Sequence, residues 1–186
     1  MKTETTQANA GFTLIEMIGV LAIIAVLAAV LVPKVFSAIN ESRYGNAVAT
    51  INTCKSATMS YFGKNFNFGT TNTATFDTTL VTGGFLEHLL TTKLGTTNIL
   101  QTTTLALCNG GTPYKLDGVN GITGATVVEI VMTNVAAADA WELSKRIDGL
   151  GMSGATSAVA STKGSVEYAL PGGTSVTTVY VYLADK

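Results

Sequence analysis

A nearly uninterrupted apolar run, FTLIEMIGVLAIIAVLAAVLV, occupies residues 12–32. As an α-helix this run is about 31 Å long, which matches the hydrocarbon core of a bilayer. Glu16 is the only charged residue in it. An acid at the centre of a membrane helix costs about 2.5–3.5 kcal/mol, and less nearer its end. A simple anchor would be better served by Leu or Val, so Glu16 requires a physical explanation.

The flanks of the run do not fit an ordinary secretory signal. The preceding segment, MKTETTQANAG, is short and polar, and no small-residue cleavage site follows the run at VPKVF. The pattern therefore predicts a single-pass membrane anchor that is retained. Lys2 precedes the run, whereas Lys34 and Arg43 follow it, so the positive-inside rule does not set its orientation.

The composition narrows the possible partners and activities. Residues 33–186 are enough for one globular domain. Charged residues make up 12% of the chain, against roughly 25% in average soluble domains, and the net charge is −1. We therefore expect no nucleic-acid partner. His88 is the only histidine, and no metal-ligand spacing or catalytic constellation is present, so we expect no metal, no cofactor and no enzymatic activity.

Cys54 and Cys108 are the only cysteines. If the domain lies outside the cytoplasm, one disulfide between them is the simplest use of an even pair. The alternative is two buried free thiols. We expect the disulfide, which would tie the Thr-rich region to the long helix.

The periodicity of the remaining chain predicts an α+β layout. Apolar residues recur at helical spacing to Phe62, so the helix should extend from about Thr13 to Phe62 and stop at Gly63. The Thr-, Asn- and Gly-rich region 63–125 should be mostly loop, with a short helix at 85–90. In it, KLDGVNG (115–121) is read as a turn rather than a calcium site. Further expected elements are a strand at 126–135, a helix at 137–148, and a hairpin of segments 165–170 and 175–184.

The sequence G-FTLIE, followed by about sixteen apolar residues and Pro33, resembles the class III signal of type IV pilins and pseudopilins. The resemblance implies cleavage between Gly11 and Phe12 by a prepilin peptidase, which also methylates the new amine of Phe12. It implies that Glu16 pairs with the Phe12 amine of a neighbouring subunit and sets helix register, and that Pro33 marks a kink. It also implies a pilin-like fold, with the long helix packed on an antiparallel β-sheet.

These implications divide the chain into four parts. They are a leader (1–11), a membrane and filament-core helix (12–33), its amphipathic continuation (34–62), and a globular head (63–186) with its sheet and C-terminal hairpin in 126–186. The expected function is that of a structural subunit, or fimbrial protein, of a type IV pilus-like filament. The alternative is a pseudopilin of a type II secretion system.

The resemblance also implies partners and location. We expect copies of the chain in a helical filament, the prepilin peptidase/methyltransferase, an inner-membrane assembly platform, and lipid before assembly. The chain should cross the bacterial inner membrane once, and after assembly reside in an extracellular pilus or a periplasmic pseudopilus.

Overall fold

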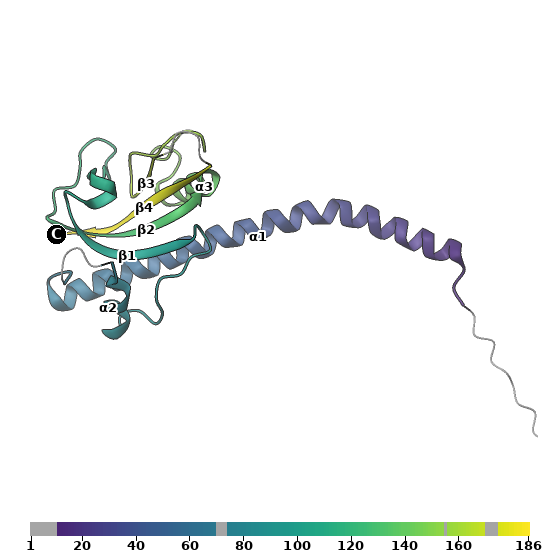
Figure 1. The fold of residues 1–186 in the computed structure, drawn as a ribbon, viewed down its shortest axis with the longest axis horizontal. Coiled ribbons are helices and arrows are strands. Elements are labelled where there is room, and N and C mark those ends of the chain that lie inside the picture. Colours follow the sequence, from purple (N-terminus) through teal and green to yellow (C-terminus); the bar gives the residue numbers. More distant parts are fainter. Residues whose placement is uncertain (1–10, 70–73, 155, 170–174) are drawn as a thin grey trace, which may run out of the picture. The chain divides into compact units, whose positions relative to one another are not determined.

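The structure is a computed structural model that describes residues 11–69, 74–154, 156–169 and 175–186. The chain divides into two units, one ending at Glu41 and one beginning at Ser42. We call residues 42–186 the C-terminal unit. Helix α1 (Leu14–Asn65) supplies the first unit and the opening of the second (Figure 1). The predicted helix is confirmed, but it runs past Gly63 and ends at Asn65, after which Phe66 adopts a positive φ of 56°.

A four-stranded antiparallel sheet forms the centre of the C-terminal unit. Its strands are β1 (Thr97–Thr104), β2 (Thr126–Ala136), β3 (Val166–Tyr168) and β4 (Val176–Asp185), in the order β1-β2-β4-β3. The fold is therefore α+β and pilin-like: a long N-terminal apolar helix packed against an antiparallel sheet. The expected strand in 126–135 and the pairing of the two C-terminal segments are confirmed. The expected turn around Pro171 lies outside the described residues.

One face of the sheet packs on helices. Helix α1 presents buried residues at three- and four-residue spacing, which places them on one side of the helix. They share a core with alternate residues of β2 and β4 and with helix α3 (Ala137–Asp148). Gly149, at a φ of 79°, ends α3 where expected. The central members of this core are Ala47, Ile51, Cys54, Val128, Ile130, Met132, Leu143, Val179, Val181 and Leu183.

Two local predictions for region 63–125 are wrong. Residues 85–90 are not helical, and the short helix α2 is Phe76–Thr82 instead. Gly83 and Gly84 follow α2, and the N–H groups of Phe85 and Leu86 both donate to the carbonyl of Leu80, which ends the helix. Strand β1 was not predicted, because its threonines were read as loop composition. It pairs with β2 over eight residue pairs.

The opposite face of the sheet is covered by a segment that we call the outer loop, residues 105–122. It contains the short 3₁₀ helix η1 (Cys108–Gly111). Cys108 and Tyr114 of this loop pack against Val127 of β2, with Tyr180 and Tyr182 of β4 beside them. The sheet is therefore buried on both faces, by helices on one and by this loop on the other.

The expected disulfide between Cys54 and Cys108 is wrong. Both cysteines are free and buried. Cys54 lies in the core that contains Val128, whereas Cys108 packs with Val127. Adjacent residues of a strand point to opposite faces of a sheet, so the sheet separates the two sulfur atoms. Burial raises the pKa of each thiol to about 11, which keeps both protonated and unreactive at neutral pH.

Two buried carboxylates fasten the outer loop to the sheet. Glu129 of β2 accepts hydrogen bonds from Tyr114 Oη at 2.6 Å, from the Asn109 backbone N–H at 2.9 Å and from Gln101 Nε2 at 2.8 Å. Glu167 of β3 accepts from Asn109 Nδ2 and, at 3.1 Å, from the Lys115 backbone N–H. Both side chains are almost fully buried, with exposed fractions of 0% and 2%. Hydrogen bonds to charged groups are among the stronger polar contacts in proteins.

We predict that Glu129→Ala destabilises the C-terminal unit by about 3 kcal/mol, because it leaves three donors without their acceptor in a closed site. Glu129→Gln should cost less, since it keeps the volume and one acceptor oxygen. Urea unfolding of the full chain in detergent micelles, followed by fluorescence of the single tryptophan, Trp141, measures both. The matched control is Glu87→Ala, an exposed acid in the same unit. Equal stability of the Glu129→Ala variant and this control would contradict the fastening role.

A second prediction concerns pH. Burial raises the pKa of Glu167, so protonation is easier in the folded than in the unfolded chain. Glu167 therefore contributes to the free energy of unfolding when it is protonated. This contribution is fully present below the unfolded pKa of about 4.5, and it is lost as the pH rises through the pKa of the folded chain. Glu167→Gln should remove this contribution to the pH dependence. Urea unfolding at several pH values measures the difference in free energy of unfolding between wild type and variant. We expect this difference to change in favour of wild type as the pH falls. A difference that stays constant with pH would contradict the prediction.

Candidate functional site

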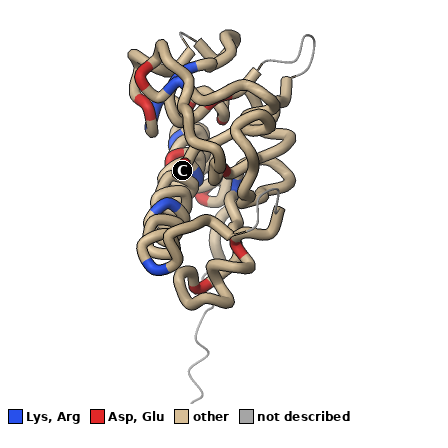
Figure 2. Tube along the Cα trace, turned by 90° about the vertical axis from the view of Figure 1, so that its left-hand side faces the viewer, with Lys and Arg blue, Asp and Glu red and all other residues tan. Residues whose placement is uncertain are grey.

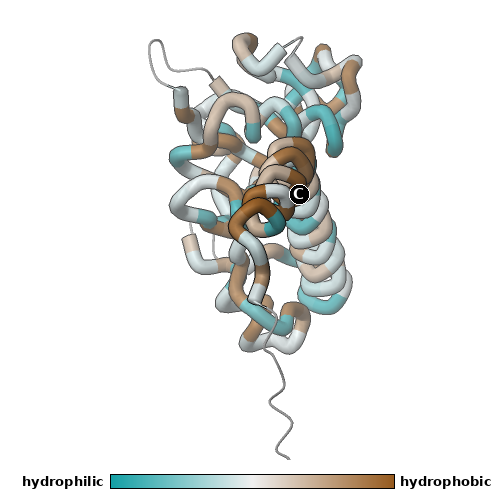
Figure 3. The backbone as a smooth tube through the Cα atoms, turned by 90° about the vertical axis from the view of Figure 1, so that its right-hand side faces the viewer, coloured by the Kyte–Doolittle hydropathy of each residue, from teal (hydrophilic) through white to brown (hydrophobic). Residues whose placement is uncertain are grey.

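The N-terminal part of α1 is an apolar surface without cover. Every residue from Gly11 to Ser42 is exposed in the chain. Figure 3 shows the apolar colouring of these turns. By length and composition, α1 is the one helix among the described residues that is able to cross a membrane. Its large exposed apolar side chains include Phe12, Leu14, Ile15, Ile18, Leu21, Ile23, Ile24, Val26, Leu27, Val30 and Leu31.

Glu16 is hydrogen-bonded to Thr13 at the first turn of this helix. Its Oε2 accepts hydrogen bonds from the Thr13 backbone N–H at 2.8 Å and from Thr13 Oγ1 at 2.7 Å. In return, the Glu16 N–H approaches Thr13 Oγ1 at 3.3 Å. This reciprocal pattern is a capping box, which satisfies helix N–H groups that have no partner in the preceding chain. The acid also lies at the positive end of the helix dipole.

The capping box supplies a local reason for an acid in an apolar run. Thr13-x-x-Glu16 is its sequence signature, a local signal that is separate from the pairing role implied by the family resemblance. Only Oε2 is used, so among the described residues Oε1 has no hydrogen-bond partner. The same carboxylate can therefore cap its own helix and accept one further donor from outside the chain.

The expected cleavage site lies just ahead of the helix. Gly11 and Phe12 are both exposed and precede the first helical residue, Leu14. Phe12 has an exposed side-chain fraction of 83%. Proteases require an accessible, non-helical backbone, and this peptide bond meets both conditions. The leader residues before Gly11 lie outside the described part of the chain.

Pro33 lies inside α1, and the helix continues through it. Proline lacks the N–H that would bond the carbonyl four residues earlier, which weakens the helix at that turn. One turn later, Ser37 Oγ donates to the Pro33 carbonyl at 3.1 Å. Pro33 therefore marks a locally weakened but unbroken turn, and a kink there stays a prediction.

A metal site in the described residues of the C-terminal unit would require several His, Cys, Asp or Glu side chains close together. No group of three or more His, Cys, Asp or Glu side chains in that part of the chain is placed to hold a metal ion. The carboxylate of Asp117 instead accepts from the Val119 and Asn120 N–H groups at 2.8 and 2.7 Å and from Asn120 Nδ2 at 2.8 Å. These contacts make it a turn, as predicted from KLDGVNG.

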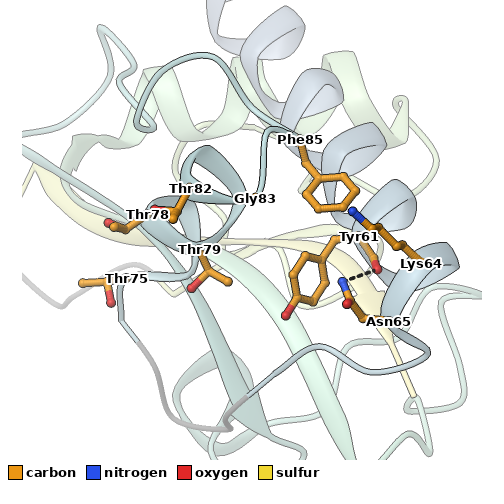
Figure 4. Close-up of a pocket in the computed structure, with 9 residues that line it drawn as sticks. All are labelled: Tyr61, Lys64, Asn65, Thr75, Thr78, Thr79, Thr82, Gly83 and Phe85. Atoms are coloured by element: carbon orange, nitrogen blue, oxygen red, sulfur yellow. Dashed lines mark hydrogen bonds between the residues drawn. The ribbon is translucent and has the colours of Figure 1, made fainter.

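A cavity of about 480 Å³ lies between the end of α1 and α2 (Figure 4). Tyr61 and Phe85 form its aromatic wall, with ring centroids 5.4 Å apart in an edge-on arrangement. Lys64 Nζ lies 5.5 Å from the centroid of the Phe85 ring, and Asn65 Nδ2 donates to the Tyr61 carbonyl. The remaining lining is threonine hydroxyls and Gly83. Lys64 is the only charged side chain among the described residues that line it.

Comparison with protein families identifies one motif. Residues 6–32 match the model of the prokaryotic N-terminal methylation motif. This motif is the class III prepilin signal of type IV pilins and pseudopilins, and it spans the expected cleavage site, Glu16 and the apolar run. No curated protein and no solved structure matches the chain.

We predict that the mature chain begins at Phe12 and carries a methylated amine. The motif and the accessible Gly11–Phe12 bond are the basis. Mass spectrometry of the N-terminal peptide from the producing bacterium measures it. Gly11→Leu is the control, because a bulky residue at the cleavage position should leave the leader attached. Recovery of Met1 on wild-type chain in assembled material would contradict the prediction.

Proposed function

We propose that this chain, which carries the class III prepilin signal, is a structural subunit of a type IV pilus-like filament. It is held as a single-pass protein in the bacterial inner membrane and is then extracted into a helical polymer. The apolar N-terminal helices form the core of that polymer, and the C-terminal units coat it. The observation that carries the proposal is an exposed apolar helix that begins with an acid at a processing motif.

The exposed apolar surface of α1 requires an apolar environment in every state of the protein. A contiguous surface of this size in water would be strongly unfavourable and would cause aggregation. Lipid supplies the environment before assembly. Packed copies of the same helix supply it afterwards, so transfer from membrane to filament exchanges one apolar environment for another.

Glu16 sets the register of neighbouring helices when subunits pass from the membrane into the filament. Cleavage at Gly11–Phe12 creates a cationic amine on Phe12. A carboxylate and an amine are each costly when left alone in an apolar environment, and pairing relieves both. In each subunit Glu16 Oε2 remains with Thr13 while Oε1 is available to the Phe12 amine of a neighbour. A buried polar pair can then fix the alignment of adjacent helices.

The C-terminal unit suits a densely packed coat. Charged residues are sparse along its trace (Figure 2), in keeping with the low charge content of the chain. A surface of neutral, small and hydroxyl-bearing residues can approach copies of itself without charge repulsion or a large desolvation cost. The partners required are the prepilin peptidase/methyltransferase and an inner-membrane assembly platform.

We predict that Glu16→Ala leaves insertion and cleavage intact but strongly reduces assembly. Insertion should improve slightly, because a charge leaves the apolar run. Assembly should fail because the neighbour's Phe12 amine is then buried without a counter-charge, which costs about 3–5 kcal/mol per subunit. Glu16→Asp should be intermediate, since it keeps the charge and shortens the reach. Cells making each variant are fractionated, and processed membrane subunit is compared with sheared, imaged filament.

The matched control is Glu87→Ala, which removes an exposed acid from the C-terminal unit and should assemble normally. A normal filament yield from Glu16→Ala would refute the pairing role. If the wild-type chain is found only in short periplasmic fibres and never in sheared surface filaments, the secretion pseudopilin is the correct assignment.

A further inference from the structure

The outer loop contains two Asn–Gly sequences, Asn109–Gly110 and Asn120–Gly121. Asparagine is a thermolabile residue. Its side-chain carbonyl carbon can be attacked by the backbone nitrogen of the next residue. A following glycine favours this reaction, because it adds no side-chain hindrance and allows the backbone to reorient. By sequence alone, the two sites are equally reactive.

Asn109 is held in place by buried groups at two points. Its backbone N–H donates to Glu129 Oε2 and its Nδ2 donates to Glu167 Oε2. Its backbone sits at a φ of 47° and a ψ of 44° inside η1. Attack by the Gly110 nitrogen requires the side-chain amide to rotate away from Glu167 and the backbone to turn. Both movements break hydrogen bonds to carboxylates that solvent does not reach.

Asn120 is exposed. Its side-chain amide and its backbone N–H both contact only Asp117 among the described residues. Asp117 is itself exposed, so water competes for these hydrogen bonds and replaces them at little cost when they break. Local opening at such a site is frequent, whereas opening at Asn109 requires the outer loop to leave the sheet.

We propose that Asn120 is a site of spontaneous deamidation in the folded protein, and that the fold protects Asn109 from the same reaction. The Gly121 nitrogen loses its proton to water and forms a bond to Cγ of Asn120. The bond from Cγ to Nδ2 breaks, and the nitrogen leaves as ammonia with a proton from water. A second water opens the resulting cyclic imide to aspartate or isoaspartate. No oxidant or reductant is required.

The conversion alters the turn that Asn120 closes. An acid at position 120 places a carboxylate where Nδ2 had donated to Asp117 Oδ2. Hydrogen bonding, chiefly from the Val119 N–H, holds the pKa of Asp117 below its ordinary value, so Asp117 stays ionised and the two groups repel. A side chain at Gly118 of this turn would place its Cβ 3.2 Å from Met152 Sδ, so the turn lies beside Met152. Opening of the turn therefore disturbs the adjoining loop at 149–154 as well.

The full chain is incubated in detergent micelles at neutral pH and physiological temperature, and peptide mass spectrometry follows conversion of amide to acid and isoaspartate at both sites. We expect Asn120 to react at least roughly tenfold faster than Asn109, because Asn109 must open first. In urea-unfolded chain the two rates should be similar.

Two variants sharpen the test. Glu167→Gln should speed the reaction at Asn109 without changing Asn120. Asn120→Gln should abolish the modification at position 120 and leave Asn109 protected. The proposal is overturned if Asn109 reacts as fast as Asn120 in the folded chain, or if neither reacts while both do so in urea. If the ratio of the two deamidation rates is the same in folded and unfolded chain, the fold is not the cause of the difference between the two sites, and the proposal is overturned.

Discussion

The structure depends on a single helix that meets two different environments along its length. From Ser42 onward, α1 buries one side against the sheet, with Ala47, Ile51 and Cys54 at helical spacing. Before Ser42 no residue of it is buried, and the side chains are almost all apolar. The first part therefore cannot be stable in water by itself, whereas the second part is stabilised by the domain that it helps to build. The proposed membrane storage and polymerisation both follow from this division.

The sheet imposes the second constraint, since both of its faces must be covered. Helices cover one face with apolar contacts. The outer loop covers the other, and it is fastened mainly by Glu129 and Glu167, which accept hydrogen bonds from Asn109, Tyr114 and Lys115. Buried acidic side chains are costly unless they are hydrogen-bonded or paired, and the loop supplies the donors. The same bonds immobilise Asn109, while Asn120 at the other end of the loop stays exposed.

Glu16 and Glu129 show two uses of an acid in an apolar stretch. Glu129 is fully buried and hydrogen-bonded within its own domain, so a partner chain cannot reach it. Glu16 accepts hydrogen bonds from Thr13 through Oε2, and its Oε1 stays available. The difference lies in position, because the first N–H groups of a helix have no partner within the helix and can bond an acid there. An acid there is anchored locally and still faces outward.

Short-range patterns in the sequence determined several features of the structure. The apolar run, the T-x-x-E signature at its start, the apolar spacing of α1 and the patterns of β2 and α3 each depend on neighbours within a few residues. The tertiary structure decided the rest. It put Cys54 and Cys108 on opposite faces of the sheet, made a strand of the threonine-rich 97–104 by pairing it with β2, and replaced the helix expected at 85–90 with one at 76–82. These outcomes depend on which face of which strand a residue occupies. Such long-range placement has no signature in a single sequence, because a strand assigns its faces only once its partners and register are set.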